Sequence, residues 1–126
     1  MNTDKKAWES ITEQIIGAAM EVQRILGIGF LEKVYEKALF TELRKQGVKV
    51  KAQVKMPVSY KGENVGVYMA DLLVEDAVLI ELKCAKGLGP EHLAQCLNYL
   101  KASNLKVCLL MNFGTTRLQW KRVLNT

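Results

Sequence analysis

The sequence predicts an α/β fold, with a central mixed β-sheet of about five or six strands flanked by helices. Three observations lead to this prediction. Two stretches near the N-terminus carry apolar residues at helical spacing, several later stretches have the alternation or the short apolar runs of strands, and a third helical stretch follows Pro90. Because 126 residues leave no room for a second core, we expect residues 1–126 to form one domain.

The composition restricts the class of protein. Hydrophobic residues make up 49% of the chain and charged residues 25%, which is typical of a soluble globular protein. The first residues lack the apolar core of a signal peptide, and no apolar run approaches the roughly 18 residues of a membrane helix, so we expect a cytoplasmic protein without a membrane partner. The net charge of +5 is compatible with a polyanionic partner, and equally with an ordinary basic protein.

The three cysteines, Cys84, Cys96 and Cys108, are odd in number, widely spaced and set in apolar surroundings. This pattern indicates reduced thiols in the core rather than disulfides. No CxxC pair occurs in the chain.

Two helices are predicted before any strand. The first runs from about Ser10 to Leu26, with Ser10 and Glu13 as a capping box, and Gly27-Ile28-Gly29 ends it. The second runs from about Leu31 to Gln46 and stops at Gly47.

A strand with one solvated face is predicted from Val48 to Val58, because apolar residues alternate there with polar ones. Three of the polar residues are lysines, and they have two interpretations. They protect an edge strand from aggregation, or they form a stripe that tracks phosphates. These residues are Lys49, Lys51 and Lys55.

Two apolar runs, from about Asn64 to Val74 and from Ala77 to Cys84, predict an antiparallel hairpin. Each run is interrupted by charge, at Asp71 in the first and at Glu81 and Lys83 in the second. Burying an unpaired charge costs several kcal/mol, so a sheet keeps such residues if they pair with one another or hold a metal.

The length of the hairpin loop decides whether these charges meet. A three-residue loop of residues 75–77 puts Asp71 directly opposite Glu81, on the face that Lys83 also occupies. A two-residue loop of residues 75–76 puts Ile80 opposite Asp71 instead.

The last part of the chain predicts a helix from about Glu91 to Ala102, opened by Pro90, and then strands at Leu105–Asn112 and Arg117–Val123. Three side chains spaced three and four apart form a polar stripe on this helix. A polar stripe is costly against an apolar sheet, which favours a position that faces a site. The stripe consists of His92, Gln95 and Tyr99.

Together these residues resemble a known family. Asp71 followed by Glu81-Leu82-Lys83 in the next strand resembles the signature of the PD-(D/E)xK nuclease superfamily. The segment Gly29-Phe30-Leu31-Glu32-Lys33-Val34-Tyr35 fits the pattern of its GxxExxY branch, and Gln95-Cys96-Leu97-Asn98-Tyr99 fits the QxxxY motif of recombination helicase-nucleases and phage-type exonucleases. The likeness spans roughly residues 11–123 and implies a restriction-endonuclease-like core.

The resemblance implies metal-dependent hydrolysis of a phosphodiester bond. Asp71, Glu81 and the backbone carbonyl of Leu82 are the implied ligands of Mg²⁺ or Mn²⁺. Glu32 is implied to complete the metal shell or to help admit a second ion, whereas the simpler interpretation is that it complements the dipole of its helix. Lys83 is implied to contact the attacking water or the scissile phosphate.

Gln95 and Tyr99 are implied to hold the water or the phosphate backbone. The ordinary interpretation of Tyr99 is an amphipathic core residue. His92 lies on the same stripe, so it is a second-tier site candidate or a solvent-facing residue of a first helical turn.

The implied partner is nucleic acid, DNA rather than RNA, and many nucleases of this fold act as dimers or within larger assemblies. No stretch resembles a base-reading helix, so we expect little sequence specificity. Two other interpretations stay open. The chain is a catalytically silent module of this fold that binds nucleic acid or a protein, or it is an α/β domain in which Asp71 or Glu81 pairs with Lys83 in a structural ion cluster.

Overall fold

The computed structural model describes residues 2–125, and side chains are described from residue 7 onward. Within these residues the chain forms three helices and five strands. In chain order they are α1 (Asn2–Leu26), α2 (Glu32–Lys45), β1 (Val50–Tyr60), β2 (Glu63–Val74), β3 (Val78–Lys83), α3 (Pro90–Ser103), β4 (Val107–Asn112) and β5 (Gln119–Leu124).

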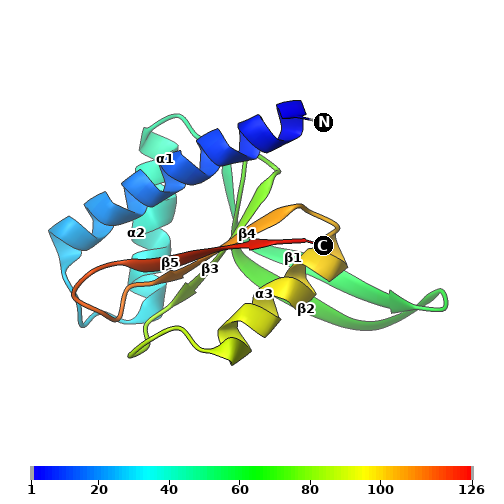
Figure 1. The fold of residues 1–126 in the computed structure, drawn as a ribbon. Coiled ribbons are helices and arrows are strands. Elements are labelled where there is room, and N and C mark those ends of the chain that lie inside the picture. The colour runs from blue at the N-terminus through cyan, green and yellow to red at the C-terminus, as the bar shows by residue number, and fades with distance from the viewer. Residues whose placement is uncertain (1, 126) are drawn as a thin grey trace.

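The five strands form one mixed sheet in the order β1-β2-β3-β4-β5. Neighbouring strands are antiparallel except β3 and β4, which are parallel because α3 connects them across one face of the sheet (Figure 1). This arrangement confirms the predicted α/β fold and the predicted mixed sheet. Among the described residues, no helix has the length and apolar character needed to cross a membrane.

The helices cover the two faces of the sheet, with α1 and α2 on one side and α3 on the other (Figure 1). The buried strand β4 shows the division, because Val107, Leu109 and Met111 pack in the core under α1 and α2, whereas Cys108 and Leu110 pack under α3. The side chains of β4 therefore alternate between the two cores, as the period of two requires.

Strands β1 and β2 interrupt this alternation at one shared position. In β2, Leu72 packs in the α1–α2 core, although Ala70, two residues earlier, packs in the α3 core. On a regular strand these residues would share a face, so the strand changes face at Asp71. The register places Gln53 of β1 opposite Asp71, and Gln53 has a left-handed φ of 55°. Because of this irregularity, Asp71 has no regular partner in the ladders that β2 forms with its neighbours.

The strand β1 lies at the edge of the sheet, as one interpretation of its lysines expects. Two of these lysines neutralise the loop between β2 and β3. Lys49 Nζ lies 2.6 Å from Asp76 Oδ2, and Lys51 Nζ lies 3.3 Å from Asp76 Oδ1. Because Lys49 and Lys51 are both paired with an acid, these contacts favour the interpretation that the lysines protect an edge strand from aggregation, rather than the interpretation that they track phosphates.

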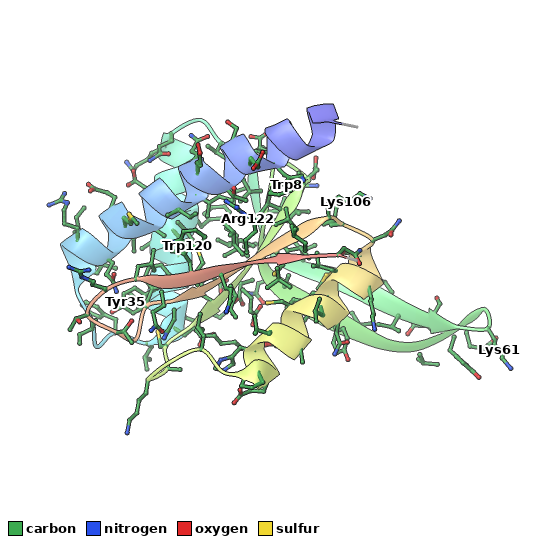
Figure 2. The ribbon with its side chains drawn as sticks, viewed as in Figure 1. Trp8, Tyr35, Lys61, Lys106, Trp120 and Arg122 are labelled. Atoms are coloured by element: carbon green, nitrogen blue, oxygen red, sulfur yellow. The ribbon has the colours of Figure 1, made fainter. Side chains whose placement is uncertain are left out.

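Two local predictions are wrong. Helix α1 begins near Asn2 rather than Ser10, so the predicted capping box lies inside the helix; no glycine or proline before Gly17 stops the helix from extending. Cys84 is exposed because β3 ends one residue before it. On the edge strand β5, the ring of Trp120 packs against the guanidinium of Arg122, opposite Trp8 (Figure 2).

The turn from α1 to α2 is closed by the buried side chain of Tyr35. Its hydroxyl donates a 2.6 Å hydrogen bond to the carbonyl of Gly27 and accepts one from the Phe30 amide at 3.3 Å. Its ring stacks on Phe113, with ring centroids 4.9 Å apart. Tyr35 therefore fixes the start of α2, and with it the position of Glu32 in the first turn.

We predict that Tyr35→Phe lowers the free energy of unfolding by about 1 kcal/mol, because the ring still packs while the hydrogen bond to the Gly27 carbonyl is lost. Urea denaturation measures the change, and an unaltered m value shows that the fold is kept. Tyr60→Phe is the matched control, since Tyr60 is 62% exposed. Equal stability of the two variants would contradict the role given to Tyr35.

Candidate active site

The hairpin of β2 and β3 brings two carboxylates to the same place. Val74 pairs with Val78 across a loop of residues 75–77, which confirms the three-residue loop and excludes the two-residue alternative. The ladder continues inward to residues 72 and 80. The next position along this register puts Asp71 opposite Glu81, as the loop length predicts.

The side chain of Asp71 accepts a hydrogen bond that a backbone carbonyl of β2 would accept in a regular ladder. The amide of Leu82 donates to Asp71 Oδ2 at 2.7 Å. In a strand the N–H and C=O of one residue point to the same neighbour, and those of the next residue point to the other. The amide of Phe113 donates to the carbonyl of Lys83 at 2.8 Å, so the backbone of Lys83 faces β4. The carbonyl of Leu82 therefore lies on the same side as Asp71.

Glu81 is only 4% exposed and pairs with one cation. Lys83 Nζ lies 3.1 Å from Glu81 Oε2. The other oxygen, Glu81 Oε1, is buried and has no hydrogen-bond partner among the described residues. Asp71 likewise has no ion pair within the described part of the chain. The Glu81–Lys83 pair is the contact that a structural ion cluster requires. One lysine nevertheless faces two carboxylates, so a second positive charge, a proton or a cation, is needed to balance them.

The pKa values of both carboxyl groups are raised. Burial, together with the nearby Asp71 carboxylate, raises the pKa of Glu81 to about 7, against the opposing effect of Lys83. Burial also raises the pKa of Asp71, while its hydrogen bond from Leu82 acts in the opposite direction. The pair is therefore poised to bind a positive charge, either a proton or a cation.

Helix α2 adds two acids to the surroundings of Asp71. The charges of Glu36 and Glu32 both raise the pKa of Asp71, and the effect of Glu36 is the larger. Glu32 is exposed, whereas Glu36 is 5% exposed and accepts hydrogen bonds from Lys33 Nζ at 3.1 Å and from Gln53 Nε2 at 2.7 Å.

Sequence reasoning did not single out Glu36. The signal was present, because Glu36 follows Glu32 by four residues and so lies on the same helical face one turn later. Its partner Gln53 is the residue with the left-handed φ, so the irregular point of β1 is connected to this acid.

Helix α3 brings Tyr99 close to the two carboxylates. Burial raises the pKa of its hydroxyl, and the charges of Glu81 and Asp71 raise it further, so Tyr99 stays a neutral hydrogen-bonding group. Gln95 Nε2 donates to the Tyr99 hydroxyl at 2.8 Å. The third residue of the stripe, His92, accepts the amide hydrogen of Gly89 at Nδ1 (3.0 Å), which caps the helix and gives His92 a structural role.

Asn112, at the end of β4, is a second residue that sequence reasoning did not single out. It is fully buried, and it pairs with Lys83 in the parallel register. Its side chain binds both the amide and the carbonyl of Ala85, at 2.9 and 3.0 Å, and also accepts the amide hydrogen of Gly114. A buried polar residue that ends an otherwise apolar strand was the available signal. Asn112 fixes the chain directly after Lys83.

The donors at this site fit a hard divalent cation. Two carboxylates and a backbone carbonyl are oxygen ligands, and Mg²⁺ is commonly held by one or two carboxylates together with water. The unpartnered Glu81 Oε1 supplies a free ligand atom. In the described residues, however, no three His, Cys, Asp or Glu side chains converge closely enough to hold a metal. The structure thus brings Asp71 and Glu81 together but leaves Glu32 outside the reach of a shared ion.

The pH dependence of the metal-free protein follows from Glu81. Its folded-state pKa of about 7 exceeds the ordinary value of 4.5, so the unfolded chain releases this proton first. We predict that the free energy of unfolding falls by about 2–3 kcal/mol as the pH rises from 4.5 to 7, and then levels off. Urea denaturation in EDTA at a series of pH values measures the fall.

Glu81→Gln should remove most of this dependence, whereas Glu63→Gln, at an exposed acid of β2, should keep it. Parallel pH curves for wild type and Glu81→Gln would contradict the assignment.

The chain is similar to solved structures of low sequence identity. SSO0001 matches with a TM-score of 0.56 and 16% identity over 74% of this chain, and this chain spans about half (49%) of that one. An alkaline exonuclease, LHK-Exo from Laribacter hongkongensis, matches with a TM-score of 0.56 and 16% identity over 86% of this chain and 68% of its own. LHK-Exo in complex with dAMP matches with a TM-score of 0.52 and 14% identity, over 86% and 76%. At this identity the likeness shows a shared fold.

No curated protein matches the sequence significantly. The family model of the PD-(D/E)XK nuclease superfamily, in contrast, matches residues 9–123. This match covers nearly the whole chain, and the α/β architecture agrees with it, including the parallel pairing of β3 with β4. The protein therefore belongs to the PD-(D/E)XK nuclease superfamily and has its restriction-endonuclease-like fold.

Proposed function

We propose that the protein is a divalent-metal-dependent nuclease of the GxxExxY branch, which hydrolyses phosphodiester bonds in DNA with little sequence specificity. The observation that carries this proposal is the meeting of Asp71 and Glu81 beside Lys83, with one buried carboxylate oxygen left unpartnered. Membership of a nuclease superfamily supports it, as does a fold shared with an alkaline exonuclease.

In this proposal Asp71, Glu81 and the carbonyl of Leu82 hold Mg²⁺ or Mn²⁺. Such an ion supplies Lewis-acid activation of water and neutralises charge on the phosphate. Glu32, exposed at the start of α2, acts on the ion through water rather than directly. Glu36 orients Gln53 and adds negative charge near Asp71, which strengthens the attraction of the site for a cation.

Lys83 has the central chemical role. Its ammonium lies 3.1 Å from Glu81 Oε2. A divalent cation held by Asp71 and Glu81 would neutralise Glu81, so that the Lys83 ammonium would be available to the scissile phosphate. There its charge opposes the negative charge that builds up in the transition state. Gln95 and Tyr99 form the QxxxY pair of this proposal, and the neutral Tyr99 hydroxyl donates to the water or to a phosphate oxygen.

One observation favours a second function. Because no third acidic ligand joins Asp71 and Glu81 among the described residues, the site also suits a module that binds nucleic acid without cutting it. The cleavage experiment below separates the two functions. A homodimer or larger assembly stays a prediction.

We predict that the protein cuts labelled DNA in Mg²⁺ or Mn²⁺ and not in EDTA. Lys83→Ala should reduce the rate by about 100- to 1000-fold, the usual cost of removing one group that stabilises transition-state charge. Lys86→Ala is the matched control, because Lys86 is an exposed lysine three residues away. Single- and double-stranded DNA and RNA are compared in parallel, and a Lys83→Ala protein as active as wild type would refute the assignment.

Metal binding has a readout that does not depend on activity. Mg²⁺ or Mn²⁺ at 100 times its dissociation constant should stabilise the protein by about 2.7 kcal/mol, which raises the Tm by roughly 10 °C in a chain of this size. Asp71→Asn and Glu81→Gln should each abolish most of this shift. Asp76→Asn, at an exposed acid of the same hairpin, should retain it. If both site variants kept the full shift, the ion would have to bind elsewhere.

A further inference from the structure

The β1–β2 hairpin extends well beyond the rest of the sheet. We call its residues 55–69 the arm; it ends at the turn beside Lys61 and projects past α3 (Figures 1 and 2). Large apolar side chains on the arm are exposed rather than packed. They include Val65, Val67, Tyr68 and Met69.

A cleft of about 520 Å³ lies between the arm and α3. Among the described residues that line it, Lys101 is the one charged side chain, Tyr68 is the one aromatic side chain, and no acid is present. The lining consists of Pro57, Val58, Ser59, Tyr68, Asn98, Lys101 and Ala102. The cleft therefore combines an aromatic face, two uncharged polar groups and a cation.

This cleft leads to the carboxylates through an aromatic contact. The Tyr68 ring, which is 43% exposed, lies 5.8 Å from the Tyr99 ring between centroids. The hydroxyl of Tyr99 in turn is close enough to Glu81 and Asp71 for their charges to raise its pKa. The two tyrosine rings therefore connect the cleft to the candidate active site.

We propose that this cleft binds single-stranded nucleic acid next to the scissile phosphate, with a base stacked on Tyr68 and a backbone phosphate held by Lys101. The proposal rests on the nuclease function and specifies its substrate. Aromatic platforms combined with cations are the usual means by which proteins hold single strands without sequence preference.

The aromatic platform distinguishes single strands from duplex. Stacking on Tyr68 requires an unpaired base with an exposed face, and in a duplex the faces are covered by neighbouring base pairs. A single lysine also provides little of the phosphate neutralisation on which duplex affinity depends. The cleft therefore selects unpaired strands, at an end, in a flap or in a loop.

The test measures binding in EDTA, so that it does not depend on cleavage. Fluorescence anisotropy is recorded with oligo-dT, oligo-U and a DNA duplex of equal length. Tyr68→Ala should weaken binding of the single strands about five- to hundredfold, while Tyr68→Phe, which keeps the ring, stays near wild type. Lys101→Ala should reduce the salt dependence of single-strand binding by about 0.7 in the logarithmic slope.

Two matched controls lie outside the cleft. Tyr60→Ala removes an exposed tyrosine of the same arm, and Lys106→Ala removes an exposed lysine just after α3 (Figure 2). Both should bind as wild type does. A Tyr68→Ala protein with an unchanged Tm shows that any loss of binding is local.

The outcomes separate this inference from the proposed function. Selective loss of single-strand affinity in Tyr68→Ala supports the inference even if no lane shows cleavage. Metal-dependent cleavage together with unchanged binding by Tyr68→Ala and Lys101→Ala overturns the inference and leaves the nuclease intact. Tighter binding of the duplex than of the single strands would also overturn the inference. Comparison of oligo-dT with oligo-U shows whether the bound strand is DNA or RNA.

Discussion

The hydrogen bond from the Leu82 amide to Asp71 organises this end of the sheet. A strand amide ordinarily donates to a carbonyl of its neighbour; here it donates to a side-chain carboxylate, so β2 and β3 separate just where the register would pair Asp71 with Glu81. Two carboxylates come together as a consequence, and Glu81 is left with an unpartnered oxygen in a buried setting. Three features accompany this replacement of a carbonyl acceptor by a carboxylate. They are the change of face in β2, the left-handed backbone of Gln53 opposite, and the buried side chain of Glu36.

Much of the fold could be predicted because its elements have clear periods. The strand β1, the apolar β3 and β4, and the glycines after α1 and α2 lie close to where the sequence indicates them, and the loop length correctly sets the register of β2 and β3. The predicted alternation in β1 holds only in part, because Ala52 is exposed. The start of α1 could not be predicted, because a capping-box pattern also occurs inside helices. The change of face at Asp71 could not be predicted from the local sequence either. It depends on the left-handed backbone of Gln53, which tertiary contacts impose.

The site could be predicted less completely than the fold. Asp71, Glu81 and Lys83 follow from charge in apolar strands, and Gln95 with Tyr99 follows from a helical stripe; the structure brings these groups to one place. His92 shares the stripe but caps the helix, because its position in the first turn serves the free amide of Gly89. Glu36 was missed although its spacing indicates it. The cleft beside Tyr68 depends on how far two strands extend past α3, which no local pattern encodes.

Asn112 has a consequence for Lys83, the lysine of the candidate site. Its amide side chain binds both backbone groups of Ala85, and Gly114 passes so close to Ala85 that an added Cβ would lie 2.5 Å from backbone atoms. The segments after β3 and β4 are thereby held together, and contacts within the chain fix the backbone that carries Lys83. Binding then loses little backbone entropy at this position, and only the flexible side chain of Lys83 must be ordered. A few polar contacts between two strand ends can in this way hold the backbone of a site rigid.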